Sequence, residues 1–167
     1  MKPATAALTL RKATFDDGPF LLALRNADDV RSQSKTQGVI HEEMHRKWFQ
    51  AHLGSPESAI WIIEREKEPL GYVRVQQIKK ENQKGKWLLS IALQPSFRGQ
   101  GLGARAVFEV CRLLQENFPA ESVVAEVVGG NAAALRLFNA CGFIMTAIVQ
   151  QDGQDMQRFE LALRPRR

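Results

Sequence analysis

One arginine and three alternate glycines form the segment of this 167-residue sequence best suited to chemistry. Arg98, Gly99, Gly101 and Gly103 follow an apolar run that stops at Pro95, and a helical pattern comes after them. This order predicts a strand, a glycine turn and a helix. The first N–H groups of a helix have no partner within it and carry the positive end of its dipole. Glycines let a phosphate approach these groups, so the turn predicts an anion site.

Two nucleotide-binding motifs are alternatives for this turn. A P-loop ends in Gly-Lys-Ser/Thr, whereas Gly103 is followed by Ala104, which argues against a nucleoside triphosphate. Residues 99–104 match the loose dinucleotide fingerprint, and Glu121 and Glu126 lie where its ribose-binding acid is expected. A five-residue spacer between strand and glycines, and the lack of further βαβ units, count against it.

The elements that must position this turn form an α+β arrangement, which we interpret as one domain over residues 1–167. Strands are expected at 7–12, 58–66, 70–78, 87–93, 123–128, 143–150 and 156–163, and helices at about 18–26, 41–54, 102–116 and 131–141. Met44, Trp48 and Leu53 are expected on the apolar face of the second helix. Strand 156–163 is expected at a sheet edge, where it could join a partner.

Composition narrows the classes of partner. The net charge is +5 and the charges are scattered, which suits an anionic small molecule and argues against nucleic acid. No signal peptide or membrane-length apolar run is seen, so no membrane partner and a cytoplasmic location are expected. Cys111 and Cys141 lack a metal or redox spacing and are expected to be small buried residues.

Two segments together resemble the GNAT N-acetyltransferases. Residues 98–103 follow a Leu-Gln-Pro strand end and resemble the acetyl-CoA signature Q/R-x-x-G-x-G/A. Residues 131–143 resemble the following helix of that family, N-x-x-A-x-x-L-Y/F-x-x-x-G-F. The resemblance implies a mixed, mostly antiparallel sheet of about seven strands with about four flanking helices. It also implies a splay between the strand at 87–93 and the strand at 122–128.

The resemblance further implies acetyl-CoA as co-substrate and a set of residues that contact it. These are Ile91, Leu93, Arg98, Gly99, Gln100, Gly101, Gly103, Ala104, Asn131 and Phe138. Asn131 could instead be an ordinary helix N-cap. Family members often have Tyr at position 138 to protonate the leaving thiolate, and Phe138 cannot do so. Glu126 is the candidate general base, and near the splay its pKa could be raised, but it could equally be a glutamate on the exposed side of its strand. Water, or no base at all, is the alternative for the proton transfer.

The first half of the chain resembles a GNAT subgroup that acetylates nucleotide-linked amino sugars, as in pseudaminic acid biosynthesis. The subgroup often carries W-R-N-x-x-x-V-R and I-x-x-x-x-H-x-x-W, and here Leu24 replaces the first Trp. The implied acceptor-binding residues are Arg25, Asn26, Arg31, His45 and Trp48. Arginines could meet a diphosphate, and a tryptophan could offer a flat surface to a ring.

Several alternatives stay open. Within the class, the acceptor could be a protein N-terminus or a small amine such as an antibiotic, and the chain a monomer or a homodimer. A non-catalytic acyl-CoA-binding module would also fit the missing tyrosine. His41-Glu42-Glu43-Met44-His45 is a literal H-E-x-x-H, which a zinc hydrolase would need. The metzincin extension is missing, and no metal site is expected.

Overall fold

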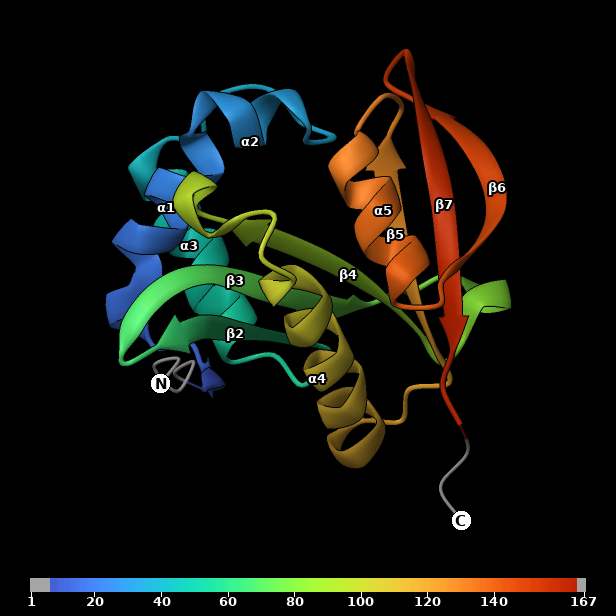
Figure 1. The fold of residues 1–167 in the computed structure, drawn as a ribbon, viewed down its shortest axis with the longest axis horizontal. Helices are drawn as coiled ribbons and strands as arrows, with labels where there is room; N and C mark the ends of the chain where they lie inside the picture. The colour runs from blue at the N-terminus through green and yellow to red at the C-terminus, as the bar shows by residue number, and fades with distance from the viewer. Residues whose placement is uncertain (1–6, 165–167) are drawn as a thin grey trace, which may run out of the picture.

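The computed structural model describes residues 7–164, which contain one seven-stranded sheet in the spatial order β1-β2-β3-β4-β5-β7-β6 (Figure 1). The strands are Leu8–Lys12 (β1), Ser58–Arg65 (β2), Glu68–Gln77 (β3), Lys86–Leu93 (β4), Ser122–Val128 (β5), Ile144–Gln151 (β6) and Gln154–Ala162 (β7). Neighbouring strands are antiparallel except for β4 and β5, which run parallel. The α+β, mostly antiparallel prediction is therefore confirmed.

The described residues form five α-helices. They are Gly18–Asn26 (α1), Asp28–Ser32 (α2), Glu42–Leu53 (α3), Leu102–Asn117 (α4) and Ala132–Ala140 (α5). Of these, α2 contacts α1 and the other four pack on the sheet. The larger apolar cluster joins α4 and α5 to one sheet face, and a smaller one joins α1 and α3 to the other. No helix in the 7–164 range has both the length and the apolar character that crossing a membrane requires.

Strand β2 shows how the sequence alternates between these two clusters. Ile60 and Ile62 pack with Leu21 and Phe49 of the α1 and α3 side. Trp61 belongs to the α4 and α5 side, where it is 4% exposed. Successive side chains point to opposite faces, so a strand covered on both faces is apolar throughout rather than alternating with polar residues.

The central opening of the fold is the splay between β4 and β5. These strands pair only over Lys86–Leu88 and Ser122–Val124. Further along, β4 keeps its pairing with β3 and β5 its pairing with β7, but not with each other. The backbone groups of the two facing strand edges are thus left free for a ligand. Figure 1 shows α1, α2 and α3 on one side of the opening and α5 on the other.

Three details differ from the sequence-based expectations. A fifth helix, α2, forms in the polar stretch after α1, where Asp28 and Asp29 occupy its first turn. The buried face of α3 carries His45 and Phe49, while Met44 is 64% exposed because it stands at the rim of a cavity. Strand β7 is paired on both sides, so the edge strand is β6. The return of the last hairpin into the sheet is a non-local pairing that local patterns do not specify.

Candidate active site

The glycine turn begins α4 in the way that the sequence predicts. Gly101 is the N-cap and has a left-handed backbone, with φ 74°. No side chain among the described residues caps this helix start. A Cβ placed at Gly99 or Gly101 would meet no described atom within 4 Å. The first amides of α4 therefore face open space, which fits the pyrophosphate of a CoA molecule.

The other residues of the turn hold it in place. Nε and Nη2 of Arg98 donate to the Leu93 carbonyl at 2.9 and 2.7 Å, and its Nη1 pairs with Asp29 of α2. The Gln100 amide donates to the carbonyl of Ser96 at 2.9 Å. In this structure the Arg98 side chain is thus a brace between the turn, β4 and α2.

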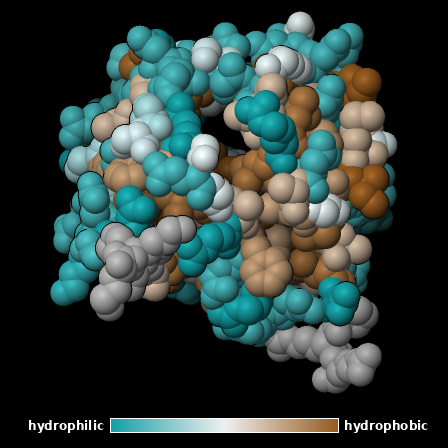
Figure 2. All heavy atoms as spheres, in the orientation of Figure 1, coloured by the Kyte–Doolittle hydropathy of each residue, from teal (hydrophilic) through white to brown (hydrophobic). Residues whose placement is uncertain are grey.

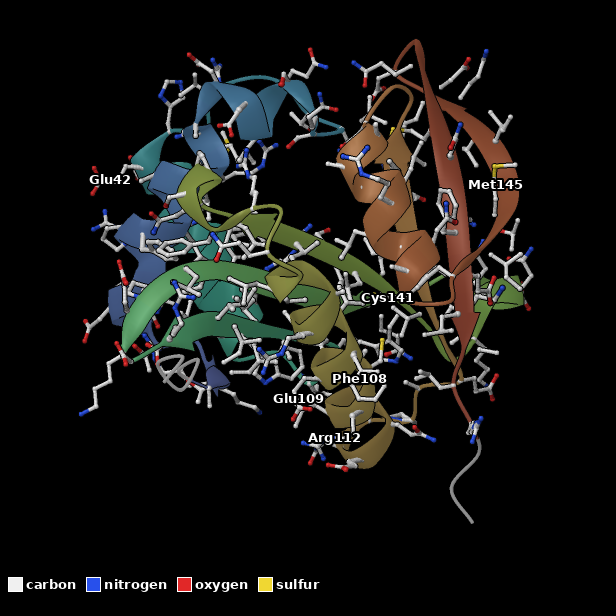
Figure 3. The ribbon with its side chains drawn as sticks, in the orientation of Figure 1. Glu42, Phe108, Glu109, Arg112, Cys141 and Met145 are labelled. Atoms are coloured by element: carbon white, nitrogen blue, oxygen red, sulfur yellow. The ribbon has the colours of Figure 1, made fainter. Side chains whose placement is uncertain are left out.

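The last two glycine-turn residues make packing contacts with α5. A Cβ on Gly103 would lie 3.2 Å from Leu137, so this glycine permits close approach of α4 and α5. The Ala104 carbonyl lies 3.7 Å from the sulfur of Cys141, a residue that is labelled in Figure 3. Cys141 is partly exposed and Cys111 is buried, and burial raises the pKa of both thiols. Both cysteines therefore stay protonated at neutral pH.

A cavity of about 520 Å³ lies between the α1 to α3 side and the splay. Figure 2 shows the hollow on this face, with hydrophobic residues at its base. From β4 its lining includes Ile91, and from the far side it includes Glu126, Asn131 and Phe138. Residues expected to contact CoA thus share one cavity with residues expected to contact the acceptor.

Three of the five expected acceptor residues line this cavity. They are Arg25 of α1 and His45 and Trp48 of α3. His45 stacks on Phe49 with ring centroids 5.7 Å apart, and burial lowers the pKa of its imidazole. His45 is therefore neutral at neutral pH.

The remaining two expected acceptor residues hold the chain rather than line the cavity. The Asn26 amide donates to the Ile40 carbonyl at 2.8 Å and its oxygen accepts from the Ile40 N–H at 2.9 Å. Arg31 pairs with Asp28 at 2.6 Å and lies outside the lining. Asn26 therefore ties the end of α1 to the residues before α3, and Arg31 also donates to the Gln37 carbonyl at 3.4 Å.

Two cavity residues on β3 are absent from the sequence-based set. They are Tyr72, which is the single tyrosine of the sequence, and Arg74. The two lie two residues apart on β3, on the same face of the strand, and both line the cavity. Burial raises the pKa of Tyr72, so its hydroxyl stays protonated. The sequence signal that could have identified Arg74 is a charged residue between Val73 and Val75 in a buried strand.

Glu126 lies in the cavity but in a different electrostatic state from that of a base with a raised pKa. Its side chain is 12% exposed, and it accepts from Arg158 at 2.9 Å and from Lys35 at 3.3 Å. Burial pushes the pKa of Glu126 up, but the Arg158 hydrogen bond and the Lys35 charge outweigh it and leave the pKa lowered. The interpretation with a raised pKa is therefore wrong, because two cations from distant segments meet this carboxylate.

This ion-pair arrangement predicts a pH-dependent contribution to stability. A carboxyl whose folded pKa lies below the unfolded value stabilises the fold above the unfolded value of 4.5. The stabilisation is lost as the pH falls through the lower folded pKa. We expect Glu126→Gln to lower the free energy of unfolding by about 2 kcal/mol at pH 7 and by less at pH 3. Thermal melting between pH 7 and pH 3 measures this.

The matched control is a glutamate on the exposed face of α4. Glu116 pairs with Arg112, and both side chains are about half exposed. Glu116→Gln should change the stability by no more than about 0.5 kcal/mol. A Glu126→Gln deficit of the same size at pH 3 and pH 7 would contradict the linkage.

Asn131 and Phe138 flank the cavity on α5. The Asn131 side-chain oxygen accepts from the Ala134 N–H at 3.1 Å, so it caps α5. Phe138 is 4% exposed and packs edge-on against Phe143 with ring centroids 5.1 Å apart. Position 138 thus contributes an apolar wall and no proton donor.

The two alternative motifs do not acquire their required structures. His41 is the N-cap of α3 with extended backbone, so it does not share a helix face with the buried His45. Figure 3 shows Glu42 at the outer surface. Within residues 7–164, no three His, Cys, Asp or Glu side chains gather as metal ligands would. The sheet is not the parallel, doubly wound sheet of dinucleotide-binding folds.

A second hollow of about 710 Å³ lies between β1 and α4. It is more open than the cavity described above and is lined by residues such as Leu10, Phe108 and Arg112. It contains neither strand edge of the splay and none of the acceptor residues. The site is therefore assigned to the smaller cavity, where the strand edges, the buried carboxylate and the aromatic residues meet.

The splayed sheet with an uncapped helix start beside it fits the acetyl-CoA site that the GNAT resemblance implies. Comparison with known proteins agrees. Residues 7–144 match the family model described as "Acetyltransferase (GNAT) domain". An N-alpha-acetyltransferase from Sulfurisphaera tokodaii is 27% identical over 120 residues, which cover 65% of this chain and 71% of that protein.

Solved structures share the same fold. An N-acetyltransferase from Staphylococcus aureus Mu50 aligns with a TM-score of 0.82 at 18% identity, over 95% of this chain and 100% of that one. A spermidine N-acetyltransferase from Vibrio cholerae, solved with CoA and spermine, aligns with a TM-score of 0.81 at 17% identity, over 93% and 95%. This chain belongs to the GNAT acetyltransferase family. It is an acetyl-CoA-dependent N-acetyltransferase.

Proposed function

We propose that this enzyme acetylates the amine of a nucleotide-linked amino sugar. The observation that carries the proposal is the shared cavity, in which Arg25, His45 and Trp48 face the splay. Trp48 is a half-buried part of this lining with the Arg74 guanidinium over its ring. Arg25 has a buried Nη1 with no hydrogen-bond partner among residues 7–164, while its Nη2 donates to the Thr36 carbonyl.

The chain's own residues supply binding and orientation for this reaction. Bound acetyl-CoA supplies a thioester, and the acceptor amine must be neutral to attack it. Glu126 is ionised at neutral pH, and we propose that it orients the amine and receives its proton directly or through water. Because its pKa is lowered, Glu126 is a weaker base than it would be with a raised pKa.

Acceptor preference tests the proposal directly. CoA release should be measured with a UDP-linked amino sugar, an N-terminal peptide and spermidine at equal acetyl-CoA. We expect the nucleotide sugar to have a kcat/KM at least about tenfold above the others, a difference of about 1.4 kcal/mol. Preference for spermidine would contradict the proposal.

A variant pair shows whether the cavity carries the preference. Trp48→Ala should raise the KM for the nucleotide sugar about tenfold, because it removes an aromatic wall of the cavity and the ring that supports the Arg74 guanidinium. Phe108→Ala removes an aromatic that is 73% exposed on α4, outside the cavity, and should leave this KM unchanged (Figure 3). Equal effects of both variants would count against the cavity as the acceptor site.

A protein N-terminus is the second candidate acceptor. The Sulfurisphaera tokodaii relative named an N-alpha-acetyltransferase is the observation that favours it. A peptide presents an uncharged backbone beside its amine, so it does not need the Arg25 guanidinium. Preference for the peptide in the same assay would establish this alternative.

A further inference from the structure

The cavity holds an arginine that the acetyl transfer itself does not require. Arg74 of β3 lines the cavity, and its guanidinium stacks over the Trp48 ring at 5.1 Å from the ring centroid. No carboxylate or carbonyl oxygen of the described residues accepts a hydrogen bond from it or pairs with it. Desolvation of this guanidinium lowers its pKa. A buried or half-buried charge normally has a partner, because its transfer from water is costly.

A second guanidinium increases the local positive charge. Arg25, Tyr72 and Arg74 line the same cavity, and the charge of Arg25 contributes to the lowered pKa of Arg74. The Nη1 of Arg25 is buried and has no hydrogen-bond partner among the described residues. Two cations that repel each other in a partly dry site become favourable when an anion enters between or beside them.

The residues that the structure describes do not supply that anion. Glu126 is the single acidic residue in the cavity lining within residues 7–164. Its two oxygens are already held by Arg158 and Lys35. Lys35 and Arg158 therefore share one carboxylate, while neither Arg25 nor Arg74 pairs with a carboxylate of the described residues. The cavity thus has uncompensated positive charge on its β3 side.

We propose that Arg74, with Arg25 beside it and Trp48 behind it, binds a phosphate or carboxylate group of the acceptor. The forked donors of a guanidinium match the paired oxygens of both groups, and an indole can support the guanidinium plane. The acceptor is then an amine that also carries a negative group, and polycations are excluded by repulsion. This inference deepens the proposed function and rests on it only in placing the acceptor in this cavity.

Anion binding to the CoA-saturated protein tests the inference. Saturating CoA occupies the anion site at the glycine turn. Binding of a further anion therefore measures the site at Arg74 on the β3 side of the cavity. UDP, glutarate and spermidine are titrated separately by calorimetry into the full chain and into Arg74→Gln. We expect UDP or glutarate to bind the wild type, with affinity at least about tenfold weaker in Arg74→Gln. Spermidine should not bind.

The matched control is another arginine stacked on an aromatic ring. Arg65 lies 5.4 Å from the Phe97 ring centroid and is outside the cavity. Arg65→Gln should bind the anion like the wild type. If Arg74→Gln fails to fold, Arg74→Lys keeps the charge and loses the fork, and should weaken binding several-fold.

The outcomes distinguish a phosphate ligand from a carboxylate ligand. They also distinguish a failure of this inference from a failure of the proposed function. Binding of UDP alone identifies a phosphate, and binding of glutarate alone identifies a carboxylate. Anion binding that Arg74→Gln leaves unchanged, or no anion binding by the wild type, overturns the inference. Acetylation of a UDP-linked amino sugar with the same KM in Arg74→Gln also overturns it, while the proposed function stands. Arg74-dependent anion binding without acetylation of that sugar leaves the inference and removes the proposed function.

Discussion

Gly101→Glu should abolish measurable acetyl-CoA binding at concentrations that saturate the wild type. A Cβ at position 101 points into open space beside the first amides of α4, where the pyrophosphate is expected. A carboxylate there fills the site and repels the ligand. The φ of 74° adds about 1 kcal/mol of strain for a non-glycine residue. We expect at least about 100-fold weaker binding by calorimetry, which is about 2.7 kcal/mol.

Two further variants separate charge from backbone strain. Gly153 in the β6–β7 hairpin has φ 76° and no described atom within 4 Å of a built Cβ, so it repeats the backbone of Gly101 far from the site. Gly153→Glu should bind acetyl-CoA like the wild type. Gly101→Ala should give a small loss, because it adds strain without charge. Equal affinities of Gly101→Glu and Gly153→Glu would mean that the turn does not hold the pyrophosphate.

Locally encoded features of the fold were predictable from the sequence. The glycine turn and the Asn131 cap each depend on a few adjacent residues. The structure confirms them because a positive φ or an N-cap is a property of the residue that adopts it. The splay came from the resemblance, since no local pattern indicates that β4 and β5 separate after three paired residues.

Features that depend on distant segments were not predictable in the same way. Glu126 meets Lys35 and Arg158, which are 91 and 32 residues away, and these contacts reverse the direction of its pKa shift. Arg74 could be placed on a strand, but the Trp48 ring beneath it belongs to α3. The charge state of the cavity is therefore a tertiary property, and a sequence pattern gives only the residues available for it.

Gly71→Ala is expected to cause the largest loss of stability of the variants considered. Gly71 of β3 pairs with Leu93 of β4, and a Cβ on it would lie 2.2 Å from the Ala92 carbonyl oxygen and 3.0 Å from the Leu93 Cα. These are backbone atoms, so no side-chain rotation relieves the contact. We expect a loss of about 3 kcal/mol in the free energy of unfolding. Denaturant unfolding followed by tryptophan fluorescence measures it.

The same clash connects the stability of the sheet to the cofactor site. The Leu93 carbonyl accepts both hydrogen bonds from Arg98 that hold the glycine turn against β4. A shift of Leu93 should therefore weaken acetyl-CoA binding several-fold even where the variant is fully folded. Gly54→Ala is the control, because its nearest atom is 4.0 Å away, and it should stay within about 0.5 kcal/mol of the wild type. If Gly71→Ala matched Gly54→Ala in stability, the close approach of β3 to β4 would not be a constraint. If it were destabilised yet bound acetyl-CoA normally, the turn would not depend on the end of β4 for its position.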